Sequence, residues 1–282
     1  EFEAQYDVIR KKNWNWSVGF NLSHNKNMLR KTYNGEDLND KVLGRPVYGI
    51  YTFKDEGIVQ KEEDIPMYPN ASGKQIPLYF QSINNPLRVG GRKIKDQNYD
   101  GVIDDKDLYY AGSTLPAVYG GLNSHLEWKG LSFDVLFSYT ISRKVMNMYK
   151  NSAFTFTKDF GVIMNYFHAN DFWTTSNRDA KYPSLEFADK DYVGQFDGNV
   201  DSNIENISFL RLKQLVIGYQ LPKNWLKGSF IKDANIYLSG ENLFLITNYS
   251  GVDPEVINPY SGKDDGTQYP LNRKVTLGLN LK

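Results

Sequence analysis

The chain has 282 residues, no cysteine, and 33 basic side chains that balance 33 acidic ones. The zero net charge argues against a general nucleic-acid binder, which would carry a strong basic excess, and the lack of cysteine excludes disulfide scaffolds, thiol nucleophiles and cysteine metal sites. No run of the sequence approaches the ~20 apolar residues of a membrane-spanning helix.

Apolar and polar side chains alternate over seven segments, and this pattern predicts seven strands with one apolar face each. The segments are 1–10, 14–24, 116–128, 131–142, 207–221, 234–244 and 271–281. In the fifth segment, Leu210 and Leu212 share one phase of the alternation and Leu215 the other, so we expect a β-bulge near Lys213.

Short and long connections alternate strictly between these segments. The short ones are 11–13, 129–130 and 222–233, and the long ones are about 25–115, 143–206 and 245–270. Outer-membrane barrels have this asymmetry, with short periplasmic turns and long extracellular loops. The mean hydropathy of −0.54 is compatible with such a barrel, because only every second strand residue faces lipid. The alternation alone also fits a soluble β-sandwich or propeller.

The first long connection contains a segment, 96–107, that matches the pattern of an EF-hand calcium loop. Hard cations such as calcium need several oxygen ligands, which alternate residues of a tight loop supply. The predicted ligands are Asp96, Asn98, Asp100, the Val102 carbonyl, Asp104 and Asp107, with Gly101 at the sharp turn. We expect a divalent cation here, calcium or else magnesium. In the alternative interpretation, the same side chains cap their own backbone amides without metal.

No catalytic motif accompanies these features. His24, His125 and His168 have no metal-ligand spacing, and the chain lacks a nucleophile elbow, a phosphate loop and a zinc signature. Asp253 and Glu255 could form an acid–base pair, but a surface turn is the favoured interpretation. We therefore expect no enzymatic activity.

Aromatic side chains are dense in 151–175. They are Phe154, Phe156, Phe160, Tyr166, Phe167, Phe172 and Trp173. Such side chains could stack on sugar rings or hold a peptide backbone, and packing between loops explains each of them equally well.

Several sequence blocks carry a family resemblance. They are the loop 96–107 with 111–116 and 119–123, the segment 209–222, and 239–244 with 249–256. In this order they resemble the C-terminal half of SusC-like (RagA-type) TonB-dependent transporters of Bacteroidota. The resemblance is close over roughly the second half of the chain and looser over 14–27 and 49–61.

The resemblance implies an all-β fold: the C-terminal strands of a transmembrane antiparallel barrel of roughly 22 strands, a size associated with a plugged lumen. Seven strands cannot close a barrel, so residues 1–282 are expected to fold beside a missing N-terminal part. That part would carry the remaining barrel strands, the plug, the TonB-engaging motif and a small extra domain. The start at Glu1 shows no export signal, which also predicts a longer protein. Barrels usually end in an aromatic residue, whereas this chain ends in Lys282, so we expect a further residue after it.

The resemblance also implies a function and a place in the cell. The intact protein would sit in the outer membrane as a multi-pass barrel in contact with lipid, with its loops extracellular. It would import oligosaccharides or peptides with a SusD-like lipoprotein as lid and TonB as the source of energy. A cation-stapled β-rich surface binding protein or adhesin without transport is the main alternative, and a passive porin is a third.

Overall fold

The computed structural model describes residues 1–38, 41–148, 168–188, 194 and 199–282. Within these ranges the protein is all β, and its helices are short 3₁₀ turns. None of these turns has the length and apolar character that crossing a bilayer would require. The turns are η1 (Glu62–Asp64), η2 (Asp105–Asp107), η3 (Ala169–Asp171), η4 (Leu185–Ala188), η6 (Asp201–Asn203) and η7 (Lys223–Leu226).

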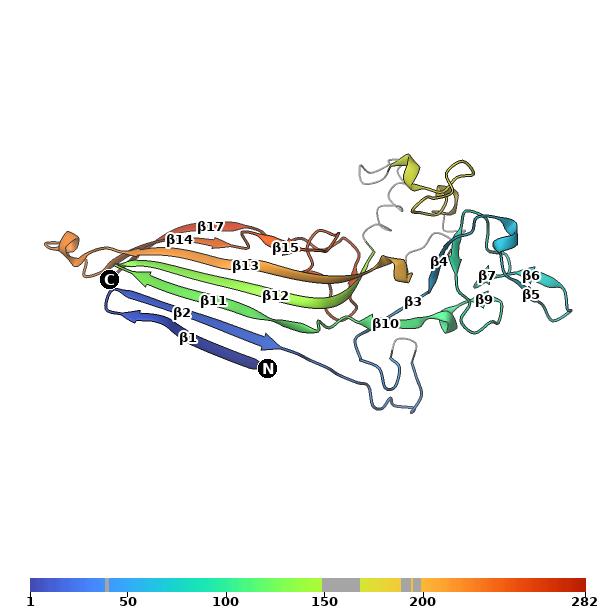
Figure 1. The fold of residues 1–282 in the computed structure, drawn as a ribbon, viewed down its shortest axis with the longest axis horizontal. Coiled ribbons are helices and arrows are strands. Elements are labelled where there is room, and N and C mark those ends of the chain that lie inside the picture. Colours follow the sequence, from blue (N-terminus) through green and yellow to red (C-terminus); the bar gives the residue numbers. More distant parts are fainter. Residues whose placement is uncertain (39–40, 149–167, 189–193, 195–198) are drawn as a thin grey trace.

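Seven long strands form one antiparallel sheet in the order β1–β2–β11–β12–β13–β14–β17 (Figure 1). They are β1 (Phe2–Lys11), β2 (Trp14–Ser23), β11 (Val118–Trp128), β12 (Leu131–Asn147), β13 (Ile204–Gln220), β14 (Ala234–Glu241) and β17 (Lys274–Leu281). Two short strands extend it, β15 (Leu245–Thr247) beside β13 and β16 (Lys263–Asp264) beside β12. All seven strands predicted from the alternation are therefore present.

The predicted bulge in the fifth segment is confirmed. Gln214 lies opposite Leu136 and Leu212 lies opposite Phe137, so Lys213 has no partner on β12. The extra residue restores the phase of the alternation. As a result, Leu212 and Leu215 point to the same face of the sheet although they are three positions apart.

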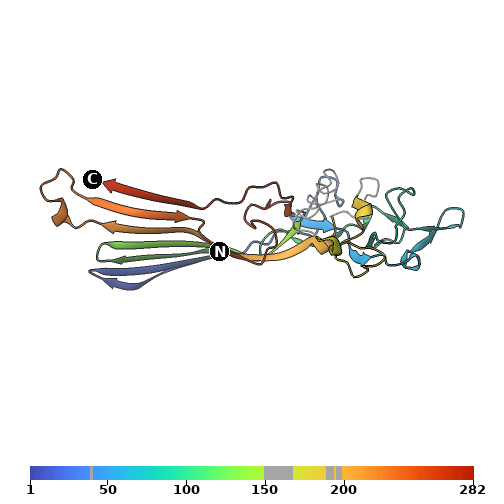
Figure 2. The same ribbon diagram turned by 90° about the horizontal axis from the view of Figure 1, so that it is seen from above.

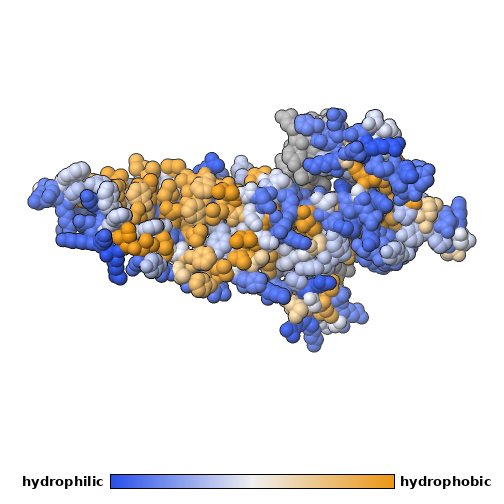
Figure 3. Space-filling view, viewed as in Figure 1, coloured by the Kyte–Doolittle hydropathy of each residue, from blue (hydrophilic) through white to orange (hydrophobic). Residues whose placement is uncertain are grey.

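The register gathers apolar side chains on one face of the sheet. One row across five strands consists of Ala4, Phe20, Leu122, Phe137 and Leu212. The adjacent row on the other face consists of Glu3, Asn21, Gly121, Ser138 and Arg211. Much of the apolar face is bare in this chain, and Leu277 of β17 is 74% exposed. Figure 3 shows an apolar band over the strands, with hydrophilic surface at both of its ends. A continuous apolar surface of this extent marks a membrane or protein interface.

The long connections all leave the same end of the sheet, and the short turns lie at the opposite end, as Figures 1 and 2 show. This arrangement confirms the alternation of short and long connections predicted from the sequence. The long connections fold against one another into a separate mass beyond the strand ends (Figure 2).

The first long connection has short strands of its own. They are β3 (Gly49–Thr52), β4 (Asp55–Ile58), β5 (Met67–Pro69), β6 (Gln75–Pro77), β7 (Tyr79–Phe80), β8 (Arg92–Ile94), β9 (Val102–Ile103) and β10 (Tyr109–Ser113). They form the pairs β3–β10, β4–β8, β5–β6 and β7–β9. Leu78 and Ile103 are fully buried in a core that also includes Val200, from the second long connection. The loop is thus a folded unit with its own hydrophobic core.

Strand β12 changes its register at Ser142. Thr140 lies opposite Phe209 whereas Arg143 lies opposite Ile207, so β12 carries one more residue than β13 here. Ser142 has φ +54°, a left-handed conformation that is uncommon for residues other than glycine. Beyond this bulge both strands continue into the loop region. The alternation breaks there, which is why the predicted bounds at 142 and 207 fall short of Asn147 and Ile204.

Candidate functional site

The predicted cation ligands lie together in the first long connection, in a compact loop between β8 and β10. The two carboxylates at its ends are buried, and Asp107 is 0% exposed. Asp96 accepts hydrogen bonds from the amides of Tyr99 (2.7 Å) and Gly101 (2.9 Å). Asp107 accepts from the amides of Gln97 (2.7 Å) and Asp104 (2.9 Å). Burial raises the pKa of Asp107 above its ordinary value.

The middle of this loop is built from tight side-chain turns. Asn98, Asp100 and Asp104 each accept through Oδ1 from the amide two positions later, at 3.0, 3.0 and 2.8 Å. The Lys106 ammonium lies 3.7 Å from Asp100 and 3.5 Å from Asp104. Gly101 has φ +83°, as the sharp turn requires.

The oxygens of this loop are therefore engaged by backbone amides, by one ammonium group and by the side-chain amide of Asn98, which donates to Asp100 at 2.9 Å. Among the described residues, no group of three or more histidine or acidic side chains is arranged to hold a metal ion. A cation would have to displace Lys106 and draw Asp100 and Asp104 toward Asp96. The cation site stays a prediction.

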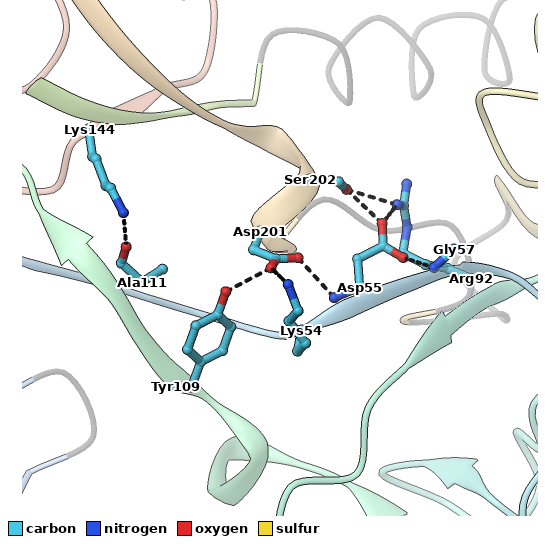
Figure 4. Close-up of polar contacts among 9 residues, drawn as sticks. All are labelled: Lys54, Asp55, Gly57, Arg92, Tyr109, Ala111, Lys144, Asp201 and Ser202. Carbon is cyan, nitrogen blue, oxygen red and sulfur yellow. Dashed lines mark hydrogen bonds and ion pairs between the residues drawn. The ribbon is translucent and has the colours of Figure 1, made fainter. Parts of the chain in front are cut away.

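A second polar cluster, not anticipated from the sequence, joins the first and second long connections (Figure 4). Asp201 of η6 accepts hydrogen bonds from Lys54 Nζ (2.6 Å), the Asp55 amide (2.9 Å) and the Tyr109 hydroxyl (2.7 Å). Burial and the bond to Asp201 raise the pKa of Tyr109 to about 12. Burial alone would raise the pKa of Asp201, but the three hydrogen bonds outweigh it and lower that pKa.

The same cluster continues through Asp55. Its carboxylate accepts from Arg92, from the Ser202 hydroxyl (2.6 Å) and from the Gly57 amide (2.8 Å). We call these six side chains the Asp201 network: Lys54, Asp55, Arg92, Tyr109, Asp201 and Ser202. The network ties β4 and β8 to the residues that immediately precede β13. Its members lie up to 148 positions apart in the sequence, so no local pattern reveals it.

Asp253 and Glu255 lie at a turn, as the sequence favours, but this turn is largely buried and not at the surface. Asp253 is 3% exposed, and Arg211 Nη2 lies 2.5 Å from its Oδ1. Arg211 Nε lies 2.6 Å from Glu255, which also pairs with Lys213. Buried charges persist in proteins when they are paired, and here the partners are 42 positions apart. The ion pairs of these two carboxylates therefore attach the third long connection to β13.

Arg143 of β12 makes a second attachment for the third connection. Its guanidinium donates to the carbonyls of Thr114 (3.0 Å), Ile257 (3.3 Å) and Asn258 (3.1 Å). Tyr249, in the same connection, is buried and donates to Asp264. The three long connections are thus joined to one another by buried polar contacts as well as by apolar cores.

The aromatic segment 151–175 is described only in part. Phe154, Phe156, Phe160, Tyr166 and Phe167 lie outside the described residues. Phe172 is buried against Tyr182, with ring centroids 5.8 Å apart. Trp173 is also buried and donates to Gln60 of the first connection at 2.9 Å. Trp173 therefore packs between the second and first connections, whereas Phe172 packs within the second.

The histidines do not converge on a site. His125 lies on the polar face of the sheet, with Nδ1 2.5 Å from Asp134 and Nε2 3.4 Å from Glu127. His24 contacts the Ala117 carbonyl, and the His168 amide donates to Asp171. Each histidine belongs to a different part of the structure.

Known proteins resemble the chain over its whole length. TonB-dependent receptor P26 of Formosa agariphila is 29% identical, and the match covers 100% of this chain and 28% of that receptor. TonB-dependent receptor SusC of Bacteroides thetaiotaomicron is 25% identical, with 100% of this chain and 26% of that receptor covered. No family model matches the chain.

The fold is similar to part of a solved structure of the RagAB peptide transporter. The TM-score is 0.67 at 22% sequence identity, with 99% of this chain and 28% of that chain covered. The chain thus spans little more than a quarter of the length of the relatives it matches. These relatives are receptors and transporters, not enzymes, and the similarity confirms the resemblance carried by the sequence blocks.

Proposed function

We propose that this chain, a homologue of SusC-type TonB-dependent receptors over its whole length, forms barrel wall and extracellular loops of an outer-membrane nutrient importer. The intact protein would be a multi-pass barrel in the outer membrane. Its cargo would be oligosaccharides or peptides, and TonB, acting on the part of the barrel outside 1–282, would supply the energy.

The structure of the sheet is the main observation in support of this proposal. Its seven long strands have one apolar and one polar face, and the long connections gather at one end (Figure 1). A barrel wall between lipid and a plugged polar lumen has this construction. A surface binding protein without transport would have no need of a bare apolar face.

We further propose that a SusD-like lipoprotein covers the long connections as a lid. The RagAB peptide importer has been solved in an "open-open" state and in a "closed-closed" state. In this chain, connections 25–115 and 143–206 would contact the lid or the ligand. The Asp201 network supports this role, because it holds the described parts of both connections in one arrangement.

The loop 96–107 would bind a divalent cation, preferably calcium, as a staple within the first connection. Asp96, Asn98, Asp100, Asp104 and Asp107 would supply side-chain oxygens, and Val102 its carbonyl. In support, Gly101 has the φ of the sharp turn and its amide bonds to Asp96. The ion would then fix the surface that meets lid or ligand.

The test uses the full-length protein in its native host. We expect uptake of the nutrient to stop when TonB is depleted, while ligand binding at the cell surface persists. Replacing residues 55–107 with a short linker should remove uptake and leave the barrel in the outer membrane. Unchanged uptake after TonB depletion, or in the variant that lacks residues 55–107, contradicts the proposal. Surface binding without any uptake in the wild type favours the adhesin instead.

A further inference from the structure

A cavity of about 460 Å³ lies between the first and third long connections. Tyr48 and Tyr51 line it from the first connection, and Tyr260 and Lys263 line it from the third. Its volume is within the ~300–1,000 Å³ of small-molecule pockets. None of the functional residues discussed above lines it.

Tyrosine rings form much of its wall. The rings of Tyr48 and Tyr260 lie with their centroids 5.2 Å apart and their planes at 54°. Tyr51, which also lines the cavity, packs on Tyr110 with ring centroids 5.7 Å apart. Tyr260 is 64% exposed, so its ring is accessible to a ligand. Tyrosine combines a flat apolar face with a polar tip, which matches a sugar ring with its apolar C–H face and hydroxyl edge.

The polar groups of the cavity indicate the charge of its ligand. Asn199 also lines the cavity, and its side-chain oxygen is buried without a hydrogen-bond partner. Lys41 and Lys263 supply two ammonium groups, and none of the residues that line the cavity is acidic. Within the described part of the chain, Lys263 has no ion-pair partner. Lys263 is exposed at the cavity, and two ammonium groups in a lining without carboxylates favour an anionic ligand.

We propose that this cavity is a subsite for a saccharide that carries a carboxylate, such as an oligomer of uronic acids. The ring would pack on Tyr48 and Tyr260, and the carboxylate would pair with Lys263. This inference rests on the proposed import function, since it names the class of nutrient that the loops receive.

The test is calorimetric titration of the purified full-length protein with digalacturonic acid and with its neutral counterpart, galactobiose. We expect Lys263→Gln to weaken digalacturonate binding by about tenfold or more, as loss of a charged hydrogen bond implies, and to leave galactobiose unaffected. Tyr260→Ala should weaken both sugars. Tyr269→Ala, at a more exposed tyrosine of the same connection that does not line the cavity, should change neither. Lys263→Arg should retain binding.

Three results would overturn this inference: no binding of digalacturonate to the wild type, equal binding to Lys263→Gln and the wild type, or preferential binding of trialanine. None of these three results contradicts the proposed import function, because that function is tested separately by TonB-dependent uptake. Conversely, sugar binding without TonB-dependent uptake would overturn the import function and leave the subsite in place.

Discussion

Arg211 of β13 and Asp253 of the third long connection form a buried ion pair, with 2.5 Å between Nη2 and Oδ1 and 4% of each side chain exposed. The second oxygen of Asp253 accepts from the Leu271 amide at 3.1 Å. One carboxylate therefore fixes the third connection both to the sheet and to the segment that leads into β17. Such a pair determines where a loop lies, even where its net contribution to stability is small.

Replacing Asp253 should release the third connection. Arg211 keeps Glu255 as a partner when the charge of Asp253 is removed, so the expected cost is that of one hydrogen bond between charged groups, about 1.5–3 kcal/mol. We expect Asp253→Asn in the full-length protein to increase proteolysis and hydrogen exchange within 245–270. Asp265→Asn, at an exposed position of the same connection, serves as control. Equal protection of both variants would show that the pair does not hold the loop.

The Asp201 network should fail in acid. Because the pKa of Asp201 is lowered in the folded protein, its contribution to stability is complete above its ordinary pKa of about 4. That contribution is lost as pH falls through the lowered value. We expect intrinsic-rate-corrected hydrogen exchange at Asp55, whose amide donates to Asp201, to be slow at pH 5 and to accelerate only when pH falls below the ordinary pKa of an aspartate.

Asp201→Asn provides the comparison for this pH effect, since an amide keeps the size of the side chain and removes its charge. The variant should exchange faster at pH 5 and lose the acceleration in acid. Asp179→Asn, at an exposed position of the second connection, should behave as the wild type. An acid step that persists in Asp201→Asn would assign it to another group.

A charged side chain introduced on the apolar face of the sheet should destabilise the barrel. Leu277 is on that face, in register with Leu238, and an arginine at the bilayer midplane of a barrel costs about 2–4 kcal/mol. We expect Leu277→Arg to lower the unfolding free energy of the full-length barrel in liposomes, measured by denaturant titration. Asn280→Arg, on the polar face of the same strand, should have a small effect. If Leu277→Arg is neutral, water covers this face.

The predicted cation loop has a matched pair of variants. Asp100→Asn keeps the oxygen that accepts from the Val102 amide and removes one negative charge from the predicted ligand set, so calcium affinity should fall by about tenfold. Asp105→Asn removes an exposed charge outside that set and should have little effect. Calorimetric titration of the full-length protein with calcium checks both. If the wild type gives no heat of binding, the loop does not bind calcium.

The sheet could be predicted from the sequence because each of its strands is exposed to different surroundings on its two sides. Alternation records that difference locally, as in Leu277, Leu279 and Leu281 of β17. The bulge at Lys213 was predictable for the same reason, since the change of phase from Leu212 to Leu215 is visible in a few residues.

The loop region could be predicted only in outline. Its short strands are stabilised by partners far away in the chain, as when β3 pairs with β10, and no periodicity marks them. Asp253 and Asp201 look like ordinary surface carboxylates in sequence. Their burial depends on Arg211 and Lys54, which arrive from distant segments. The cation loop was recognisable as a tight turn, and its metal stays a prediction.

The bulge at Ser142 separates the effects of substitutions in the two parts of β12. It separates β12 into a stretch whose neighbours are set by the sheet and a stretch whose neighbours are set by the loops. Mutations that reshape the outer stretch therefore need not shift the pairing of the inner one. Substitutions beyond Ser142 can therefore change contacts among the loops while the inner strand keeps its register in the sheet.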